Sequence, residues 1–239
     1  TQQFGNVEAI AQEKGKLIQQ LPSNGIAILN RDDPLVWQWH QRTKAKVIPF
    51  SQGEDFAAAI ATGEALGIPE AQAREALEKN YKAPPGRMSL IPGIKNSLII
   101  DSSYNASREP MLMALRVLAG YKNRRKIAVL GDMRELGDLA KAEHEAVAER
   151  AKKIADVIVT VGPLMKQYLG SKYSFGSSKE AGKFIKEKLL REGDVILVKG
   201  SQNTIFLELV VEALMANPED ADKLLCRRGK YWEKMRRAI

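Results

Sequence analysis

The chain has 239 residues, of which 44% are hydrophobic, and a formal net charge of +8. This composition is that of a globular protein and excludes a disordered one, and the length allows one large domain or two modest ones. No run of about 18 apolar residues is present, and the first residues lack the basic and apolar regions of a signal peptide, so neither a transmembrane helix nor an exported protein is expected.

The first third of the chain reads as helices and two short strands. The spacing of apolar residues and the turn residues predict helices over 7–21, 34–42, 54–66 and 68–80, and buried strands over 26–30 and 45–50. The proline-rich run 82–87 (KAPPGR) then interrupts the pattern, as a domain hinge does. We therefore expect one domain over 1–85 and a second over 86–239.

The rest of the chain alternates apolar runs with helical patterns. The predicted strands cover 97–101, 126–130, 156–161 and 194–198, and the predicted helices cover 108–120, 138–154, 178–191 and 203–216. Strands and helices in this alternation form right-handed βαβ units with a parallel sheet. The sequence therefore predicts an α/β fold of Rossmann-like type, whose ligands bind beyond the carboxyl ends of the strands.

Polar residues gather in the turns that should line this edge. DSSYNA after the first of these strands offers an acid, an aromatic ring and an amide suited to a nucleotide base, and GDMREL after the second offers two carboxylates and an arginine. KGSQN after the last strand places a lysine and a hydroxyl before a helix start, where anions bind well. Asp138 is a candidate cap for the helix that carries His144. The alternative is that these residues only cap helices and solvate turns.

Several common site motifs are missing. The chain contains no GxGxxG, no GxxxxGK[ST], no GxSxG and no zinc-ligand spacing. It therefore lacks a recognisable phosphate-cradling loop of its own. The single cysteine, Cys226, cannot form an internal disulfide, which favours a reducing cytoplasm.

The positive charge lies in the second half of the chain. Residues 1–85 hold 9 basic and 10 acidic side chains, and residues 86–239 hold the remaining 28 and 19. The stretch 223–239 carries seven basic residues and one acid. It reads either as a solvated tail or as a segment that attracts an anion such as a nucleotide, a nucleic acid or an acidic metabolite.

Three long motifs carry a resemblance to a known family. They are IIDSSYNASREPMLMALRVLA, AVLGDMRELGDLAKAEHEAVAERA and ILVKGSQNTIFLELVVEAL. Together with FGNVEAIAQEKGKLI, AILNRDDP and PPGRM, they resemble the Mur ligases, and the GDMRELG block points to the members that add D-alanyl-D-alanine. The resemblance runs from about residue 4 to 216. It implies a partial central, ATP-binding domain without its P-loop over 1–85 and a C-terminal Rossmann-like ligase domain over 86–239.

The resemblance implies a reaction and its participants. ATP phosphorylates the carboxylate of a UDP-muramoyl peptide, Mg²⁺ assists, and the amine of D-Ala-D-Ala attacks the acyl phosphate during cytoplasmic peptidoglycan synthesis. The P-loop and the N-terminal part of the enzyme would be further partners. They are absent here, so the chain resembles the back half of the enzyme, either a truncated or proteolysed product or one half of a split protein.

The resemblance also assigns roles to residues, motif by motif. The residues implied at the nucleotide are Arg87, Asp101, Tyr104, Asn105, Asn30 and Asp32. The residues implied at the dipeptide are Asp132, Glu135, Lys199, Gly200 and Ser201. Lys14 in AQEKGKL matches a lysine that binds magnesium when carbamylated, because a carbamate is an oxygen ligand suited to this metal. No residue is assigned a catalytic role, and His144 is expected to act through packing or positioning first.

One segment departs from the family pattern. GEDFAAAIATG stands where the family has an asparagine that contacts adenine, which weakens the expectation of nucleotide binding by the first half.

Two alternatives remain open: another Mur or folylpolyglutamate-type ligase, and a non-catalytic Rossmann-like module that binds a nucleotide or anion. Neither a membrane nor nucleic acid is an expected partner. We predict that the 239-residue chain does not hydrolyse ATP by itself.

Overall fold

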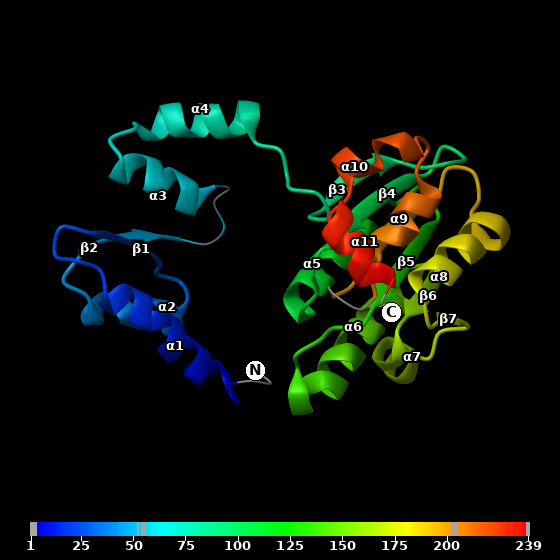
Figure 1. Cartoon of the computed structure of the whole chain (residues 1–239), viewed down its shortest axis with the longest axis horizontal. Coiled ribbons are helices and arrows are strands. Elements are labelled where there is room, and N and C mark those ends of the chain that lie inside the picture. The colour runs from blue at the N-terminus through cyan, green and yellow to red at the C-terminus, as the bar shows by residue number, and fades with distance from the viewer. Residues whose placement is uncertain (1–3, 52, 54–55, 202–204, 238–239) are drawn as a thin grey trace. The chain divides into compact units, whose positions relative to one another are not determined.

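The computed structural model describes residues 4–51, 53, 56–201 and 205–237 and divides into two compact units (Figure 1). The first unit is Thr1–Lys82 and the second is Ala83–Ile239. In the described ranges, no helix is both long and apolar enough to cross a membrane.

In its described residues, the first unit contains a two-stranded parallel sheet and four helices. The strands are β1 (Ile26–Asn30) and β2 (Lys46–Phe50). The helices are α1 (Val7–Gln19), α2 (Pro34–Trp37), α3 (Ala57–Ala65) and α4 (Glu70–Asn80), and a 3₁₀ turn, η1 (Gln38–Arg42), follows α2. Ala11, Ala27, Leu29 and Trp39 form the small core. The side chains of Asn6 and Asp33 accept backbone N–H groups at the starts of α1 and α2, which explains where these helices begin.

These elements match the predicted ones with small differences. The helix predicted over 34–42 is an α-helical turn followed by a 3₁₀ turn, and the helix predicted from residue 54 begins at Ala57. Residues 54 and 55 lie outside the described ranges.

The second unit is built on a six-stranded sheet with the order β3-β4-β8-β5-β6-β7. Its strands are β3 (Ser89–Pro92), β4 (Leu98–Ser102), β5 (Lys126–Gly131), β6 (Val157–Val161), β7 (Tyr173–Phe175) and β8 (Val195–Lys199). All neighbouring pairs are parallel except β3 with β4. The four strands predicted from apolar runs are the central ones, because strands covered on both faces consist almost wholly of apolar residues.

Helices cover both faces of this sheet. One apolar core lies between the sheet and α5 (Arg108–Ala119), α6 (Ala140–Ile154) and α7 (Pro163–Leu169). The opposite core lies between the sheet and α8 (Ser178–Phe184), α9 (Glu208–Leu214) and α10 (Ala221–Leu224). This arrangement is a three-layer, doubly wound α/β domain of Rossmann-like type, as predicted.

Several elements of this unit, including α10, were not predicted, and two predicted helices differ in detail. The short elements β3, α7 and β7 lack the long apolar runs on which the prediction depends. The helix predicted over 178–191 continues beyond α8 as a π-helical turn, Ile185–Leu189. Of the helix predicted over 203–216, the structure shows α9, and residues 202–204 lie outside the described ranges.

The C-terminal segment is folded onto this domain. After a 3₁₀ turn, Pro218–Asp220, the chain forms α10 and later α11 (Lys230–Arg237). Between these helices Leu225, Cys226 and Arg227 are buried. The expectation of a solvated tail is therefore wrong for this part of the segment, in which Leu225 belongs to the same apolar core as α9.

Candidate functional site

The predicted turns meet at one edge of the six-stranded sheet. In the sheet register, Lys199 at the end of β8 lies beside Ser102 of β4 and Leu130 of β5. Just beyond these strands, the backbone N–H of Ser201 donates to the carbonyl of Asp132 at 2.9 Å. The loops after β4, β5 and β8 are therefore in direct contact, as the parallel arrangement predicts.

A pocket of about 450 Å³ opens at the ends of β4 and β8. Its lining residues, all from the second unit, are Gly86, Arg87, Met88, Ser102, Tyr104, Asn105, Ala106, Ser107, Glu109, Pro110, Met113, Arg116 and Lys199. They combine an apolar wall with three cationic side chains and the N-terminal turn of α5, whose partial positive charge also favours anions. The pocket can accept a planar aromatic group that carries negative charge.

Lys199 is the buried cation of this pocket. Its ammonium donates to the Ser102 hydroxyl at 3.1 Å and to the Asn105 carbonyl at 2.9 Å. Burial and the nearby Arg87 together lower its pKa to about 8, and Asp101 partly opposes this effect. Two adjacent cations in a partly dry pocket repel each other, so an anionic ligand between them is favoured. Lys199 lines the same pocket as Arg87, Tyr104 and Asn105, for which the resemblance implies nucleotide contacts, whereas for Lys199 it implies a contact with the dipeptide.

Tyr104 and Arg87 form the aromatic side of the pocket. The Arg87 guanidinium lies 4.5 Å from the centroid of the Tyr104 ring, within the range of a cation–π contact. The backbone N–H of Tyr104 donates to the carbonyl of Gly86 at 3.1 Å, which holds the two segments together. Asn105 is exposed beside them, and its Oδ1 accepts the N–H of Ala106 at 2.9 Å.

Asp101 differs from its neighbours because it is fully buried. Its Oδ1 accepts the backbone N–H of Ser103 at 3.0 Å, and its Oδ2 has no hydrogen-bond partner among the described residues. Burial raises its pKa to about 6. The side chain holds the turn after β4 and does not line the pocket, so Asp101 would influence a nucleotide there through that turn.

Asp132 caps a helix that the sequence did not predict. Its carboxylate accepts the backbone N–H of Met165 at 2.6 Å and that of Leu164 at 3.2 Å, at the start of α7. Gly162 (φ +104°) makes room for it, because a Cβ atom there would lie 2.7 Å from the carboxylate. Burial also raises the pKa of Asp132. The carboxylate is directed into the protein, where it joins the loop after β5 to α7.

Ser201 joins three loops through its backbone and side chain. In addition to the bond to Asp132, its hydroxyl donates to the carbonyl of Ala106 at 3.3 Å and accepts the N–H of Arg134 at 3.1 Å. The side chain is 2% exposed, so it shapes the loops from within.

Gly200 allows a close approach of two strand ends. A Cβ atom at this position would lie 2.5 Å from a side-chain carbon of Leu207 and 2.9 Å from the Cα atom of Gly131. Its role in the structure is therefore steric, at the point where β5 and β8 end side by side.

His144 is completely buried on α6 and holds the loop after β5. Its Nε2 accepts the backbone N–H of Met133 at 3.0 Å, so the proton is on Nδ1, which donates to the carbonyl of Ala140 at 2.6 Å. The expected positioning role of His144 agrees with this geometry.

Two acidic residues that follow in this loop, Glu135 and Asp138, are exposed. Glu135 is exposed and has a left-handed backbone (φ 62°). Asp138 does not cap α6, because the residue before that helix is Leu139, and Asp138 lies in a 3₁₀ turn. Gln202 and Asn203 of the KGSQN motif lie outside the described ranges.

The other predicted residues belong to the first unit. Asn30 ends β1, and its side chain accepts the backbone N–H of Asp32 at 3.0 Å. Lys14 is exposed on α1. In the described part of the chain, no group of three or more His, Cys, Asp or Glu side chains could hold a metal ion.

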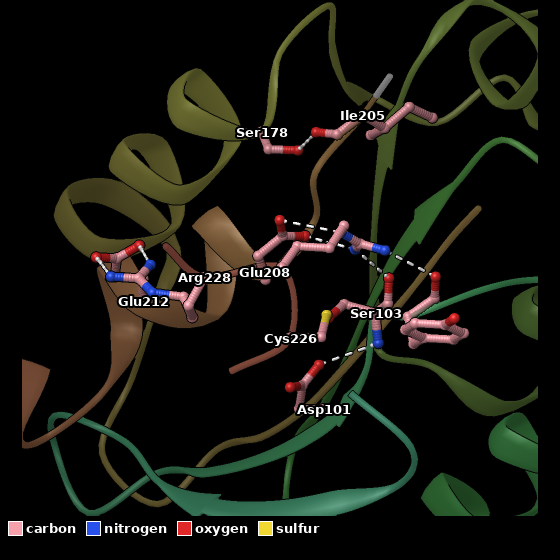
Figure 2. A network of polar contacts seen from close by, with 10 residues as sticks. Asp101, Ser103, Ser178, Ile205, Glu208, Glu212, Cys226 and Arg228 are labelled. Atoms are coloured by element: carbon pink, nitrogen blue, oxygen red, sulfur yellow. Dashed lines mark hydrogen bonds and ion pairs between the residues drawn. The ribbon is translucent and has the colours of Figure 1, made fainter. Parts of the chain in front are cut away.

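Sequence reasoning missed a polar cluster behind the pocket. In Figure 2, Glu208, Cys226, Ser103 and Asp101 lie near one another, although they come from α9, the C-terminal segment and the end of β4. Arg227 makes a buried ion pair with Glu208 there, and Arg228 pairs with Glu212 and Asp222. The only sequence signal was the basic composition of 223–239, which does not indicate which carboxylates these arginines meet.

The fold and the pocket define a ligand-binding α/β domain of the doubly wound class, joined to a smaller α/β unit. Residues 86–202 match the family model described as Mur ligase, glutamate ligase domain, and residues 1–70 match the Mur ligase middle domain. The chain belongs to the Mur ligase family.

Relatives of known identity agree with this assignment. The UDP-N-acetylmuramoyl-tripeptide–D-alanyl-D-alanine ligase of Escherichia coli K12 is 32% identical over 90% of this chain and 57% of its own length. A crystal structure of MurF from Acinetobacter baumannii matches with a TM-score of 0.72 at 24% identity, over 90% of this chain and 56% of its own. MurF from Thermotoga maritima in complex with ADP matches with a TM-score of 0.70 at 21% identity, over 92% and 59%. The structural likeness concerns the fold, and the chain spans just over half the length of these relatives.

Proposed function

We propose that this chain forms the C-terminal portion of an ATP-dependent ligase that joins D-Ala-D-Ala to a UDP-muramoyl tripeptide. The observation that carries the proposal is the pocket at the ends of β4 and β8, which combines cations with an aromatic ring in a chain of the Mur ligase family. The E. coli relative bears the name of this activity. Within the proposal, 1–85 is part of the middle domain and 86–239 is the C-terminal domain.

The pocket is assigned to the nucleotide. Tyr104 and the apolar wall provide surface for the base, and Asn105 offers an amide for its polar edge. Arg87 and Lys199 place positive charge where a phosphate would lie. The relative from T. maritima was crystallised with ADP, which supports a nucleotide as the ligand of this family. Asn30 and Asp32 of the first unit remain expected nucleotide neighbours.

The loop after β5 and the segment after β8 are assigned to the dipeptide. In the proposed reaction, ATP transfers its γ-phosphoryl group to the muramoyl peptide carboxylate, which gives an acyl phosphate and ADP. The amine of D-Ala-D-Ala attacks the acyl carbon, phosphate leaves, and the amine loses a proton. Glu135 is exposed on this loop, whereas the buried groups of Asp132, Gly200 and Ser201 hold its shape. A rigid frame of this kind favours reaction by orienting the amine.

A magnesium ion is expected to accompany ATP in the proposed reaction. Lys14 is the residue the family pattern assigns to it, and its carbamate would supply an oxygen ligand. The described residues around the exposed Lys14 provide no carboxylate cluster to complete such a site. The use of ATP and a UDP-linked precursor also places the proposed reaction in the cytoplasm.

The test is product formation by the whole enzyme that contains this segment. With ATP, Mg²⁺ and UDP-muramoyl tripeptide, D-Ala-D-Ala should be consumed in step with phosphate release, whereas glutamate should not. Preference for glutamate would favour a folylpolyglutamate-type ligase. ADP binding without any acceptor-dependent turnover would favour the non-catalytic module.

A further inference from the structure

Arg227, in the C-terminal segment, donates hydrogen bonds to the turn after β4, which carries Tyr104. Its Nη1 donates to the Tyr104 carbonyl at 2.8 Å, and its Nη2 donates to the Ser103 carbonyl at 2.7 Å. On its other side, Nε and Nη2 contact the two carboxylate oxygens of Glu208 at 3.1 and 2.5 Å. One side chain thus links α9 to the turn after β4.

Both side chains of this ion pair, Arg227 and Glu208, are buried. The Arg227 side chain is 2% exposed, and that of Glu208 is not exposed at all. Such a pair contributes little to net stability, because removing both charges from water costs about as much as their attraction returns. Its geometry is nevertheless specific, because the rigid, planar guanidinium donates to two carbonyls and a carboxylate at the same time. This argues for a role in positioning.

The residue before Arg227 contacts the hinge side of the same pocket. Gly86 has a positive φ of 76°, and a Cβ atom on it would lie 2.9 Å from the Cys226 sulfur and 3.1 Å from the Tyr104 Cβ. Burial raises the pKa of the Cys226 thiol to about 11, so it stays protonated and acts through packing. Cys226 therefore packs beside Gly86, which precedes Arg87, and Arg227 donates hydrogen bonds to the backbone that carries Tyr104.

We propose that the C-terminal segment 225–229 is a positioning element of the pocket, in which Arg227 fixes the Ser103–Tyr104 turn and thereby sets the Tyr104 ring against Arg87. The Arg227 guanidinium lies 5.9 Å from the Tyr104 ring centroid, whereas that of Arg87 lies 4.5 Å from it. Arg227 itself does not line the pocket. That the ligand is a nucleotide rests on the proposed function, whereas the positioning of the turn does not.

The neighbouring arginine provides a matched control. Arg228 also makes ion pairs, with Glu212 at 2.8 Å and with Asp222 at 2.9 Å, but neither partner belongs to the pocket. In Figure 2 the pair of Arg228 and Glu212 lies apart from Ser103 and Asp101. Arg227→Met and Arg228→Met therefore remove the same kind of side chain from adjacent positions. Only the first of them contacts the turn that carries Tyr104.

The experiment uses hydrogen exchange and ADP binding on the 239-residue chain. Arg227→Met should speed amide exchange at 103–106 and weaken ADP binding about tenfold, which corresponds to the loss of one well-placed interaction. Arg228→Met should leave both within about twofold. Methylguanidinium should restore part of the ADP affinity to Arg227→Gly and none to Arg228→Gly, a result that a general loss of stability would not produce.

The outcomes separate this inference from the proposed function. Faster exchange at 103–106 in Arg227→Met alone, with no ADP binding even by the unchanged chain, would support the positioning role and contradict the nucleotide assignment. Equal exchange and equal ADP affinity in the two methionine variants would overturn the positioning role. If Arg227→Met does not fold, Arg227→Lys, which keeps the charge but loses the fork, should show a smaller change in the same direction, and no change there would also overturn it.

Discussion

The Nε2 atom of His144 accepts the backbone N–H of Met133 at 3.0 Å, and both residues are fully buried. A side chain of α6 thus fixes the loop that follows β5. Because the Nδ1–H of the same ring donates to the Ala140 carbonyl, the imidazole is held as the neutral tautomer.

His144→Phe should destabilise the second unit by about 1–3 kcal/mol, because the Met133 N–H would be buried without an acceptor. Urea unfolding would measure this change. The other histidine, His40, contacts the Trp37 carbonyl at 2.6 Å in the first unit, and His40→Phe is the control. An unfolding free energy of the second unit that is unchanged in His144→Phe would contradict the positioning role.

Asp132→Ala should lose about 1–2 kcal/mol, since the cap of α7 would be removed. Asp132→Asn should lose less, because one amide oxygen can still accept an N–H. Thermal unfolding of both variants would check this order. If Asp132 acted only on a bound dipeptide, neither variant would change the stability of the unliganded protein.

Lys199 should make ADP binding pH-dependent. Its pKa of about 8 means that the free ammonium loses its charge as the pH rises through 8, while the phosphates of ADP are already ionised. The affinity for ADP should therefore fall between pH 7 and pH 9, and binding near pH 8 should take up protons. Calorimetry in buffers of different ionisation enthalpy would measure both effects.

The control for this prediction is a second lysine. Lys199→Met should bind ADP more weakly, with a flat pH profile, whereas Lys166→Met, on the exposed surface of α7, should behave as the unchanged protein. A profile that keeps its fall near pH 8 in Lys199→Met would show that another group is responsible.

Asp101 should lower the stability of the protein above its raised pKa. Its pKa is about 6 in the folded protein and 3.8 for an ordinary aspartate, so between these values the folded state holds a proton that the unfolded state has released. Stability from this group is therefore greatest below about pH 4 and falls as the pH rises to 6. Asp101→Asn should stabilise by roughly 3 kcal/mol above pH 6 and by little near pH 4.

Unfolding at several pH values would test this, with the exposed Asp138→Asn as the control. A difference between Asp101→Asn and the unchanged protein that stays constant from pH 4 to pH 7 would be inconsistent with a buried, ionising carboxylate.

The 239-residue chain should show no magnesium-dependent ATP hydrolysis, because it contains no GxxxxGK[ST] loop to hold the phosphates. Phosphate release would be measured with and without D-Ala-D-Ala. Robust turnover would mean that another part of this chain replaces that loop.

Much of the fold could be predicted because the central strands are long apolar runs. Residues 126–130 and 194–198 contain almost only apolar side chains, and both became buried parallel strands. The short β7 and the seven-residue α7 left no such pattern. The sequence predicts Asp138 as the N-cap of α6, but Asp138 lies in a 3₁₀ turn that precedes this helix. Local spacing does not distinguish such a turn from a cap.

The sequence by itself determined the alternation of strands and helices, the edge at which the turns meet, and the motifs that identify the family, because all of these are written in local pattern and order. Only the tertiary structure decided which polar groups face a ligand and which hold the loops. Asp132 and Ser201 are used within the protein, Lys199 lies in the pocket, and Arg227 reaches Tyr104 from 123 positions along the chain. The physical reason is that burial and hydrogen bonding depend on neighbours brought together by folding, which residue type and spacing do not specify.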